Sequence, residues 1–417
     1  MKRKRIIPIS SGKGGVGKTT LAVNYALGLS QHGRTVLIDL DTGTSSVRNC
    51  LDVPVTYDLY HFFRKARPLA DCVTSLDGRL DPHGQYRNFG FVAGPRHMID
   101  DLTNLSQARR DQVVDAINAL DVSFIVLDLK AGLDSAVVDF LPFCNSGILV
   151  FTPHLPAATL AASDIVKAAL FRKLRAVFAP NSVIYEQLPG MTPSFVGSLI
   201  DRVEDVYDES VQNLDGFVAD LHHALGDHPV VRLVADVVDS FAVHYVLNMF
   251  NGVRDSYETA VKPFVENLER HVSGHLAILN LGWLVAHEEI DRTNRERVPF
   301  LLARPARRAS QAQDAATREL AKLARRYLEP AAARPRLPLS VPRQTASVAI
   351  PSAYLEGQLE ILTQMYSDTK SASYRDNIAY VVHRSLHVMA RGSTCDLGDT
   401  RLYKRSEIQS ILTGGAS

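Results

Sequence analysis

The chain has 417 residues, with 46 Lys and Arg against 45 Asp and Glu, so its net charge at pH 7 is +1. This length predicts about two or three domains, and the balanced charge excludes a general affinity for nucleic acid while leaving room for a local basic patch. The four cysteines form no C-x-x-C pair, which argues against a zinc or iron–sulfur site, and no apolar run approaches the ~20 residues of a membrane-spanning helix.

The first predicted elements are a short buried strand at residues 5–10 and a helix at residues 19–32. Between them, SGKGGVGKTT matches the phosphate-loop pattern G-x-x-x-x-G-K-[ST]. Glycines let backbone N–H groups approach a phosphate, the lysine at position 18 reaches the β- and γ-phosphates, and the threonine at position 19 is placed to bind Mg²⁺. The predicted nucleotide-binding residues of this loop are Gly12, Lys13, Gly14, Gly15, Val16, Gly17, Lys18, Thr19 and Thr20.

Acidic residues end two of the following strands. The strand at 35–39 ends in Asp39-Leu40-Asp41, and the apolar strand at 124–128 ends in Asp128. Beside a phosphate loop, one acid of the first pair can hold a Mg²⁺-bound water and the other can orient the attacking water, while Asp128 is the expected partner acid for Mg²⁺. The alternative for the first pair is a helix cap or an Asx turn.

Further apolar strands are predicted at 89–93, 148–152, 241–247 and 277–285, with helices between them. This alternation predicts an α/β fold with a parallel, doubly wound sheet covered on both faces. Asn248 follows the strand at 241–247 and is a candidate to contact the base, with a turn asparagine as the alternative. The chain continues Met249-Phe250-Asn251 and so lacks the N-K-x-D motif of GTP-binding proteins, which favours ATP.

The domain organisation follows from shifts in composition. Residues 1–328 form the predicted phosphate-loop domain, with a polar helical insertion at about 171–239 and a closing helix at 310–327. Residues 329–351 are rich in proline and predict a linker. Residues 352–417 predict a small helical C-terminal appendage, with helices at 353–365 and 374–389 and a further candidate at 401–412.

Several segments together resemble the MinD/ParA family of ATPases. SGKGGVGKTT, with its additional Lys13, resembles the family's deviant phosphate loop. Residues 39–51 and 124–141 are similar to its two switches, GILVFTPHLPAA and VLNMF resemble two of its strands, and residues 281–310 resemble its last strand and the loop that follows. The sequence LFRKLRAVF, at the start of the insertion, resembles the FlhG/FleN-like branch of flagellar-number regulators.

The resemblance implies a homodimer that sandwiches two ATP molecules. Lys13 would cross to the partner's phosphates and act in catalysis with Lys18, while Asp41 positions the water. Asp39 and Asp128 would hold Mg²⁺ through water, and Thr19 would bind it directly. The implied activity is a slow, partner-stimulated ATP hydrolysis that resets a cytoplasmic switch, which positions or counts flagellar or polar machinery.

Two other functions in the same superfamily remain open. A partition ATPase would bind non-specific DNA through a basic surface formed by Arg304, Arg307, Arg308, Arg325 and Arg326. A metal- or cofactor-inserting ATPase is the other alternative, although the lone histidines lack ligand spacing. A protein partner could bind through residues 330–417, and the membrane is a weaker alternative that rests on Leu402, Tyr403, Ile408, Ile411 and Leu412. The expected location is cytoplasmic, with peripheral attachment at the pole, membrane or nucleoid left open.

One residue departs from the family pattern within the second switch. Lys130 stands where relatives usually carry a small residue or proline. A cation at this position is expected to alter the response to the γ-phosphate.

Overall fold

The computed structural model describes residues 4–41, 46–96, 106–133, 135–178, 192–204, 213–286, 288–303, 359–360, 362–364, 373–391, 396–404 and 406–408. The predicted closing helix at 310–327, the linker at 329–351 and the arginines of the alternative DNA surface lie outside these residues.

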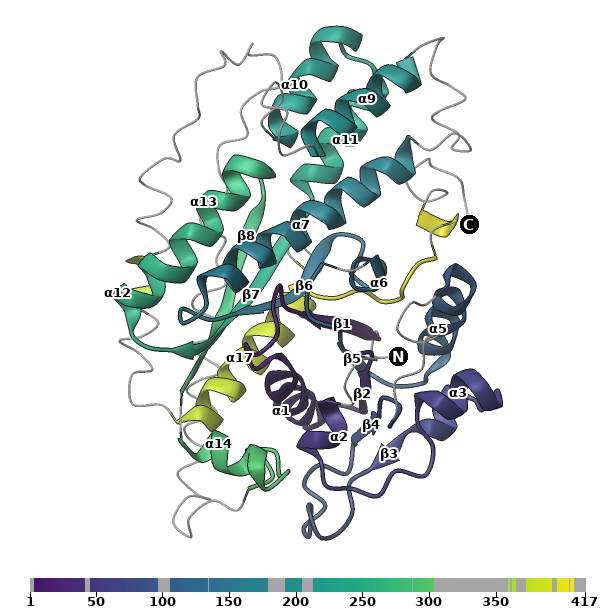
Figure 1. Ribbon diagram of the computed structural model, residues 1–417, viewed down its shortest axis with the longest axis vertical. Coiled ribbons are helices and arrows are strands. Elements are labelled where there is room, and N and C mark those ends of the chain that lie inside the picture. Colours follow the sequence, from purple (N-terminus) through teal and green to yellow (C-terminus); the bar gives the residue numbers. More distant parts are fainter. Residues whose placement is uncertain are drawn as a thin grey trace.

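A single eight-stranded sheet forms the centre of the molecule, in the order β3-β4-β2-β5-β1-β6-β7-β8 (Figure 1). Every pairing is parallel except that of β3 with β4, so the predicted doubly wound parallel sheet is confirmed. The short edge strand β3 was not predicted. The strands are β1 Arg5–Ser10, β2 Thr35–Asp39, β3 Thr74–Ser75, β4 Phe89–Val92, β5 Phe124–Asp128, β6 Asn145–Phe151, β7 Ala242–Phe250 and β8 Ala277–Val285.

Helices cover both faces of this sheet, which explains why the central strands are mostly apolar and are buried along their whole length. All residues of β1, β2 and β5 are buried. Figure 1 shows α1 (Lys18–Ser30) and α17 (Tyr374–Arg391) on one face, and α7 (Pro156–Val177) and α13 (Lys262–His271) on the other. The other helices of the first half are α2 Ser46–Cys50, α3 Leu59–Lys65, the 3-10 helix η1 Leu69–Cys72, α5 Gln107–Ala119 and α6 Ser135–Asp139.

Three helices follow α7 and extend the molecule beyond the sheet, at the top of Figure 1. They are α9 (Thr192–Glu204), α10 (Leu214–Leu225) and α11 (Pro229–Asp239), with apolar side chains such as Phe217 buried among them. The predicted insertion is therefore helical where it is described. Residues 171–177, at the start of the predicted insertion, continue α7.

The stretch between β7 and residue 303 differs from the prediction in one element. The expected helix after β7 is present as α12 (Val253–Ser256), the π-helical turn η2 (Tyr257–Val261) and α13. After β8, a loop was expected, but the structure has the helix α14 (Glu288–Arg295). Its high content of charged residues gives it no continuous apolar stripe, so the sequence pattern did not reveal it. Among the described residues, no helix is both long enough and apolar enough to span a bilayer.

The predicted C-terminal helix is present as α17, and it packs directly into the main fold. A Cβ on Gly28 of α1 would lie 2.7 Å from a methyl carbon of Val382, and one on Gly282 of β8 would lie 2.9 Å from a methyl carbon of Val381. Arg384, which is buried, donates from Nε to the Asn280 carbonyl oxygen at 2.7 Å. The C-terminal region is therefore part of the helical layer that covers α1 and β8.

After α17, residues 396–404 run past the beginning of the central strand. Ile6 and Asp399 exchange two backbone hydrogen bonds of 2.7 and 3.0 Å, and Arg5 forms a 2.6 Å ion pair with Asp396. Leu402, one residue of the weak membrane-helix candidate, is buried and exchanges hydrogen bonds with the Asn118 side chain. This segment thus covers the end of the sheet at which β1 begins, and the phosphate loop lies at the opposite end of β1.

Candidate functional site

The phosphate loop lies between β1 and α1, as predicted, with the N-terminus of α1 directed at it. Gly15 and Gly17 have φ angles of +82° and +80°, a conformation that side chains disfavour. Gly12 touches α7 so closely that a Cβ there would lie 2.4 Å from the backbone carbonyl carbon of Ala161. The loop is therefore shaped both by its own glycines and by its contact with α7.

Lys18 and Thr19 both contact Asp128 at the end of β5. Lys18 Nζ lies 2.5 Å from Asp128 Oδ1, and Thr19 Oγ1 donates to Asp128 Oδ2 at 2.7 Å. The side chains of Lys18 and Asp128 are both buried. The structure thus brings together three of the predicted site residues, in a buried ion pair with a hydroxyl beside it.

Asp39 lies next to Asp128, because the two residues are directly paired between β2 and β5. Asp39 is fully buried; its Oδ1 accepts from the Asp41 N–H at 3.2 Å and its Oδ2 from the Val47 N–H at 3.1 Å. Burial, and after it the charge of Asp128, raise the pKa of Asp39 well above its usual range, against the opposing effect of the Val47 N–H. Two adjacent buried carboxylates make this position favourable for a cation.

The donor set fits Mg²⁺. Carboxylate and hydroxyl oxygens are the ligands that Mg²⁺ takes from proteins, and it usually completes its shell with phosphate and water. Asp39, Asp128 and Thr19 supply such oxygens beside the phosphate loop. Within the described part of the chain, no group of three or more His, Cys, Asp or Glu side chains could hold a metal by itself. A metal here would therefore depend on the nucleotide for part of its coordination.

Asp41 and Asn248 are placed near this centre in different ways. Asp41 follows β2 and is partly exposed, and residues 42–45 after it are outside the described part of the chain, so its role in orienting water stays a prediction. Asn248 in β7 is buried and donates from Nδ2 to the Val16 carbonyl oxygen at 2.7 Å. The structure thus gives Asn248 a contact with the phosphate loop, while its contact with a base stays a prediction.

The second switch also contacts the phosphate loop. The Gly132 N–H donates to the Ser11 carbonyl oxygen at 2.8 Å, and Gly132 has a φ of +98°. Lys130, two residues earlier, is partly buried, and Leu133, one residue later, is exposed. A backbone hydrogen bond thus connects this segment directly with the residue that precedes Gly12 of the loop.

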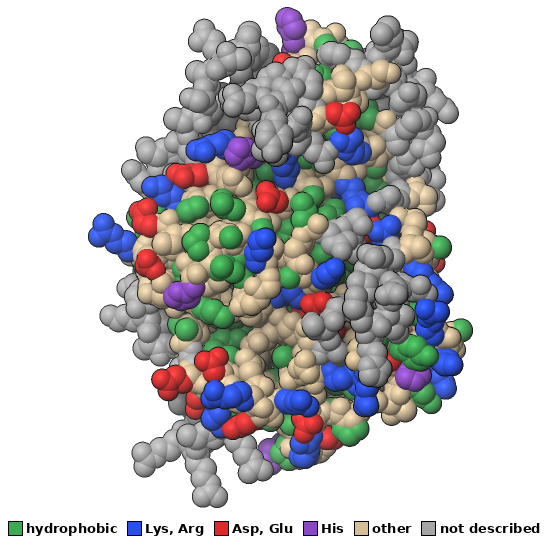
Figure 2. All heavy atoms as spheres, in the orientation of Figure 1, with side chains coloured by type: hydrophobic (Ala, Val, Ile, Leu, Met, Phe, Trp, Pro, Cys, Tyr) green, Lys and Arg blue, Asp and Glu red, His purple; other side chains and the backbone are tan. Residues whose placement is uncertain are grey.

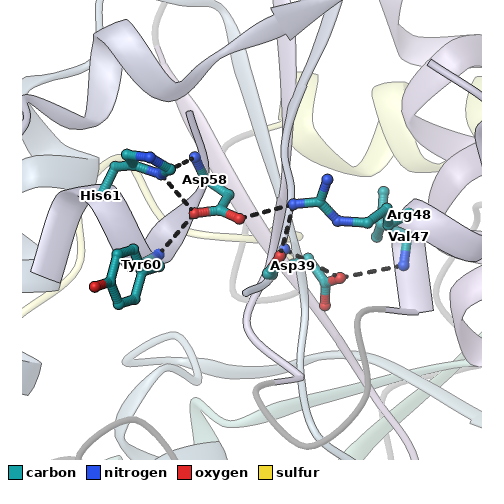
Figure 3. A network of polar contacts seen from close by, with 7 residues as sticks. Asp39, Val47, Arg48, Asp58, Tyr60 and His61 are labelled. Atoms are coloured by element: carbon teal, nitrogen blue, oxygen red, sulfur yellow. Dashed lines mark hydrogen bonds and ion pairs between the residues drawn. The ribbon is translucent and has the colours of Figure 1, made fainter. Parts of the chain in front are cut away.

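Sequence reasoning missed a polar network that begins at Asp39. The second N–H donor to Asp39 Oδ2 is Gly94, at 3.4 Å, and the Gly94 carbonyl oxygen accepts from Arg48 Nη2 at 3.2 Å. Arg48 Nη2 also donates to Asp58 Oδ2 at 2.8 Å (Figure 3). The sequence signal was weak: Asp58 before an aromatic run is a potential helix N-cap, but nothing in the pattern connects it with Arg48.

The raised pKa of Asp39 leads to a prediction about stability. The folded protein retains the Asp39 proton to a higher pH than the unfolded chain does, so this group makes wild type less stable as the pH rises from about 4 towards the raised pKa. Asp39→Asn removes the titration. As the pH rises across this window, the free energy of unfolding of the variant minus that of wild type should therefore increase, by up to about 1.4 kcal/mol per pH unit. Urea unfolding at a series of pH values measures it, and parallel profiles for the two proteins would contradict it.

The chain is similar in sequence to a P-loop NTPase family model and to MinD proteins. The family model described as ParA, NUBPL iron-transfer P-loop NTPase, matches residues 2–61. The septum site-determining protein MinD of Escherichia coli K12 is 30% identical over 188 residues, which cover 44% of this chain and 65% of that protein. MinD of Helicobacter pylori is 26% identical over 242 residues, covering 54% of this chain and 84% of that protein.

The matched region covers only part of some relatives. It spans 52% of the length of the putative MinD of Chlorella vulgaris, at 28% identity and 37% of this chain. Among solved structures, the cell division ATPase MinD of Pyrococcus furiosus matches 76% of this chain and 95% of its own, with 16% identity and a TM-score of 0.42. A plasmid partition protein of Borrelia burgdorferi bound to AMPPNP matches 70% of this chain and 90% of its own, with 14% identity and a TM-score of 0.40. The sequence matches show that part of this chain is similar to P-loop NTPases and to MinD proteins.

Proposed function

We propose that this protein is an ATP-hydrolysing molecular switch that dimerises with ATP and thereby positions a cellular structure. The observation that carries the proposal is the contrast between the two lysines of one phosphate loop. Lys18 is buried against Asp128 within its own protomer, whereas Lys13 is exposed on the outer side of the loop. One lysine is thus placed to serve the protomer's own nucleotide, and the other is accessible to a second copy.

The residues of the site would act together on one nucleotide. Backbone N–H groups of the loop would bind the phosphates, and Lys18 would turn from Asp128 to the β- and γ-phosphates. Thr19, Asp39 and Asp128 would hold Mg²⁺, which when bound neutralises charge on the phosphate oxygens. Asp41 would orient the water that attacks the γ-phosphate.

The surface beside Lys13 is consistent with contact between two copies. Leu160 of α7 is 47% exposed, and its neighbour Ala161 is the residue that touches Gly12 of the phosphate loop. Leu133, in the second switch, is also exposed. Apolar side chains on two segments that contact the loop would lose water on association, while Lys13 reached the partner's phosphates.

We also propose which cellular structure the protein positions. The relatives named above act, by their names, in septum placement and plasmid partition, which are both tasks of spatial positioning. The resemblance of residues 170–178 to flagellar-number regulators favours flagellar or polar machinery as the cargo. We propose a cytoplasmic protein that binds a protein partner through residues 330–417.

The dimer can be tested with Asp41→Ala, a change that should block hydrolysis and leave ATP binding intact. We expect this variant to double its mass by light scattering when Mg²⁺ and ATP are added, and to stay monomeric with ADP. Adding Lys13→Ala to the variant should return it to a monomer in ATP. If the Asp41→Ala protein binds ATP and remains a monomer, the proposed dimer is wrong.

A further inference from the structure

The start of α3 is held by one carboxylate with two sets of partners. Asp58 is the N-cap of α3, and its Oδ1 accepts from the Tyr60 N–H at 3.1 Å. Nδ1 of His61 lies 2.9 Å from the same oxygen and also accepts from the Asp58 N–H at 3.3 Å, which completes a capping box. The other oxygen, Oδ2, is the one that contacts Arg48. Asp58 therefore connects the first turn of α3 with a residue of α2.

One nitrogen of Arg48 makes two hydrogen bonds. This nitrogen, Nη2, donates both to Asp58 and to the carbonyl oxygen of Gly94, which follows β4. The ion pair is largely shielded, with side-chain exposures of 16% for Arg48 and 9% for Asp58. Breaking a shielded pair costs more than breaking one on the surface, so Arg48 and Asp58 are expected to move together.

The same two segments hold Asp39. Its Oδ2 accepts from the N–H of Val47, which precedes Arg48 in α2, and from the N–H of Gly94. Figure 3 shows the Arg48 guanidinium pointing towards Asp58, with Asp39 below the guanidinium and Val47 beside Arg48. A movement of the Asp39 carboxylate would therefore disturb the backbone at two places: Val47, next to Arg48, and Gly94, whose carbonyl oxygen accepts from Arg48.

We infer that Arg48 is a positioning residue that links Asp39 of the nucleotide site to the first turn of α3, so that α3 changes with the nucleotide bound. The inference rests on the proposed ATP switch, because binding of Mg²⁺ and ATP at the site is what would move Asp39. The outer surface of α3, which would change, is accessible to solvent. Tyr60 is 37% exposed, and Arg64 and Lys65 at the end of the helix are also exposed. Figure 2 shows Lys and Arg side chains gathered at the right-hand edge, where Figure 1 places α3 and α5.

A tryptophan in α3 can report this change. The chain has one tryptophan, Trp283, so the reporter protein carries Tyr60→Trp together with Trp283→Phe. Its emission is measured with Mg²⁺ and either ATP or ADP, and nucleotide binding is measured separately by equilibrium dialysis. We expect the emission to differ between the two nucleotides.

Two substitutions then test the link without removing the helix. Asp58→Asn keeps a good N-cap for α3 and loses the ion pair with Arg48, so the emission difference should fall at least fivefold while the helix content is unchanged. Arg48→Ala should lower the difference equally. Arg48→Lys should retain at least half of it, because one lysine nitrogen can make both contacts. Arg64→Ala, near the other end of the same helix, is the matched control and should retain the full difference.

The outcomes separate this link from the proposed function. If the reporter binds ATP and its emission does not distinguish ATP from ADP, or if Asp58→Asn leaves the difference intact, the link is wrong and the switch is unaffected. If the reporter and wild type both fail to bind ATP, the proposed function is wrong, and the link with it. If Arg48→Ala does not fold, Asp58→Asn and Arg48→Lys still decide the question.

Discussion

Replacing Lys18 by alanine is expected to lower ATP hydrolysis about 100-fold or more and to reduce the free energy of unfolding by about 3 kcal/mol. The first effect follows from the loss of the cation that stabilises charge on the phosphates. The second arises because Asp128 is buried and would lose its partner at 2.5 Å. Phosphate release and urea unfolding, both at pH 7, measure the two effects.

Lys13→Ala is the matched control on the same loop. Lys13 is exposed, so its removal should change the free energy of unfolding by less than about 0.5 kcal/mol. In the proposed dimer, Lys13→Ala should nevertheless lower ATP hydrolysis about as much as Lys18→Ala does. A stable Lys18→Ala protein would contradict the stabilising role of the buried pair, and a fully active Lys13→Ala protein would contradict the role of Lys13 across the dimer.

A second large effect is expected for Gly12→Ala, which should destabilise the protein by about 3 kcal/mol and weaken ATP binding at least tenfold. The added Cβ would lie 2.4 Å from the Ala161 carbonyl carbon, and backbone cannot move aside by changing a rotamer. The phosphate loop would therefore separate from α7. Urea unfolding and equilibrium dialysis with ATP are the measurements.

Gly14→Ala provides the comparison for this prediction. A Cβ at Gly14 would meet no atom within 4 Å, so the free energy of unfolding should stay the same or rise by up to about 1 kcal/mol. If the two variants were equally stable, the close packing of the loop on α7 would not be the feature that constrains Gly12.

The elements that sequence reasoning predicted well are those with local patterns. β1, the phosphate loop and α1 are contiguous, and β8 was predicted with the observed bounds, Ala277–Val285. Asp39 and Asp128 could be placed together because the carboxyl ends of parallel strands share one edge of the sheet. For these residues, the local sequence indicates both the helix or strand that forms and its position in the fold.

The features that were missed depend on contacts between distant segments. α17 could be predicted as a helix, but its place in the fold depends on two glycines. Gly28 of α1 leaves room for Val382, and Gly282 of β8 leaves room for Val381. Asn248 was recognised as a strand-end residue, yet its bond to the Val16 carbonyl exists only after β7 has joined the sheet. No local pattern contains such pairings.

The antiparallel bridge between Ile6 and Asp399 bears on the order in which the chain can assemble. β1 leaves the ribosome before Asp399, which follows all eight strands in the chain. During synthesis, the backbone of Ile6 therefore lacks this partner until the strands of the sheet have been made. Contacts of such long sequence separation slow folding, so the closing of the sheet by residues 396–404 is expected to be a late step.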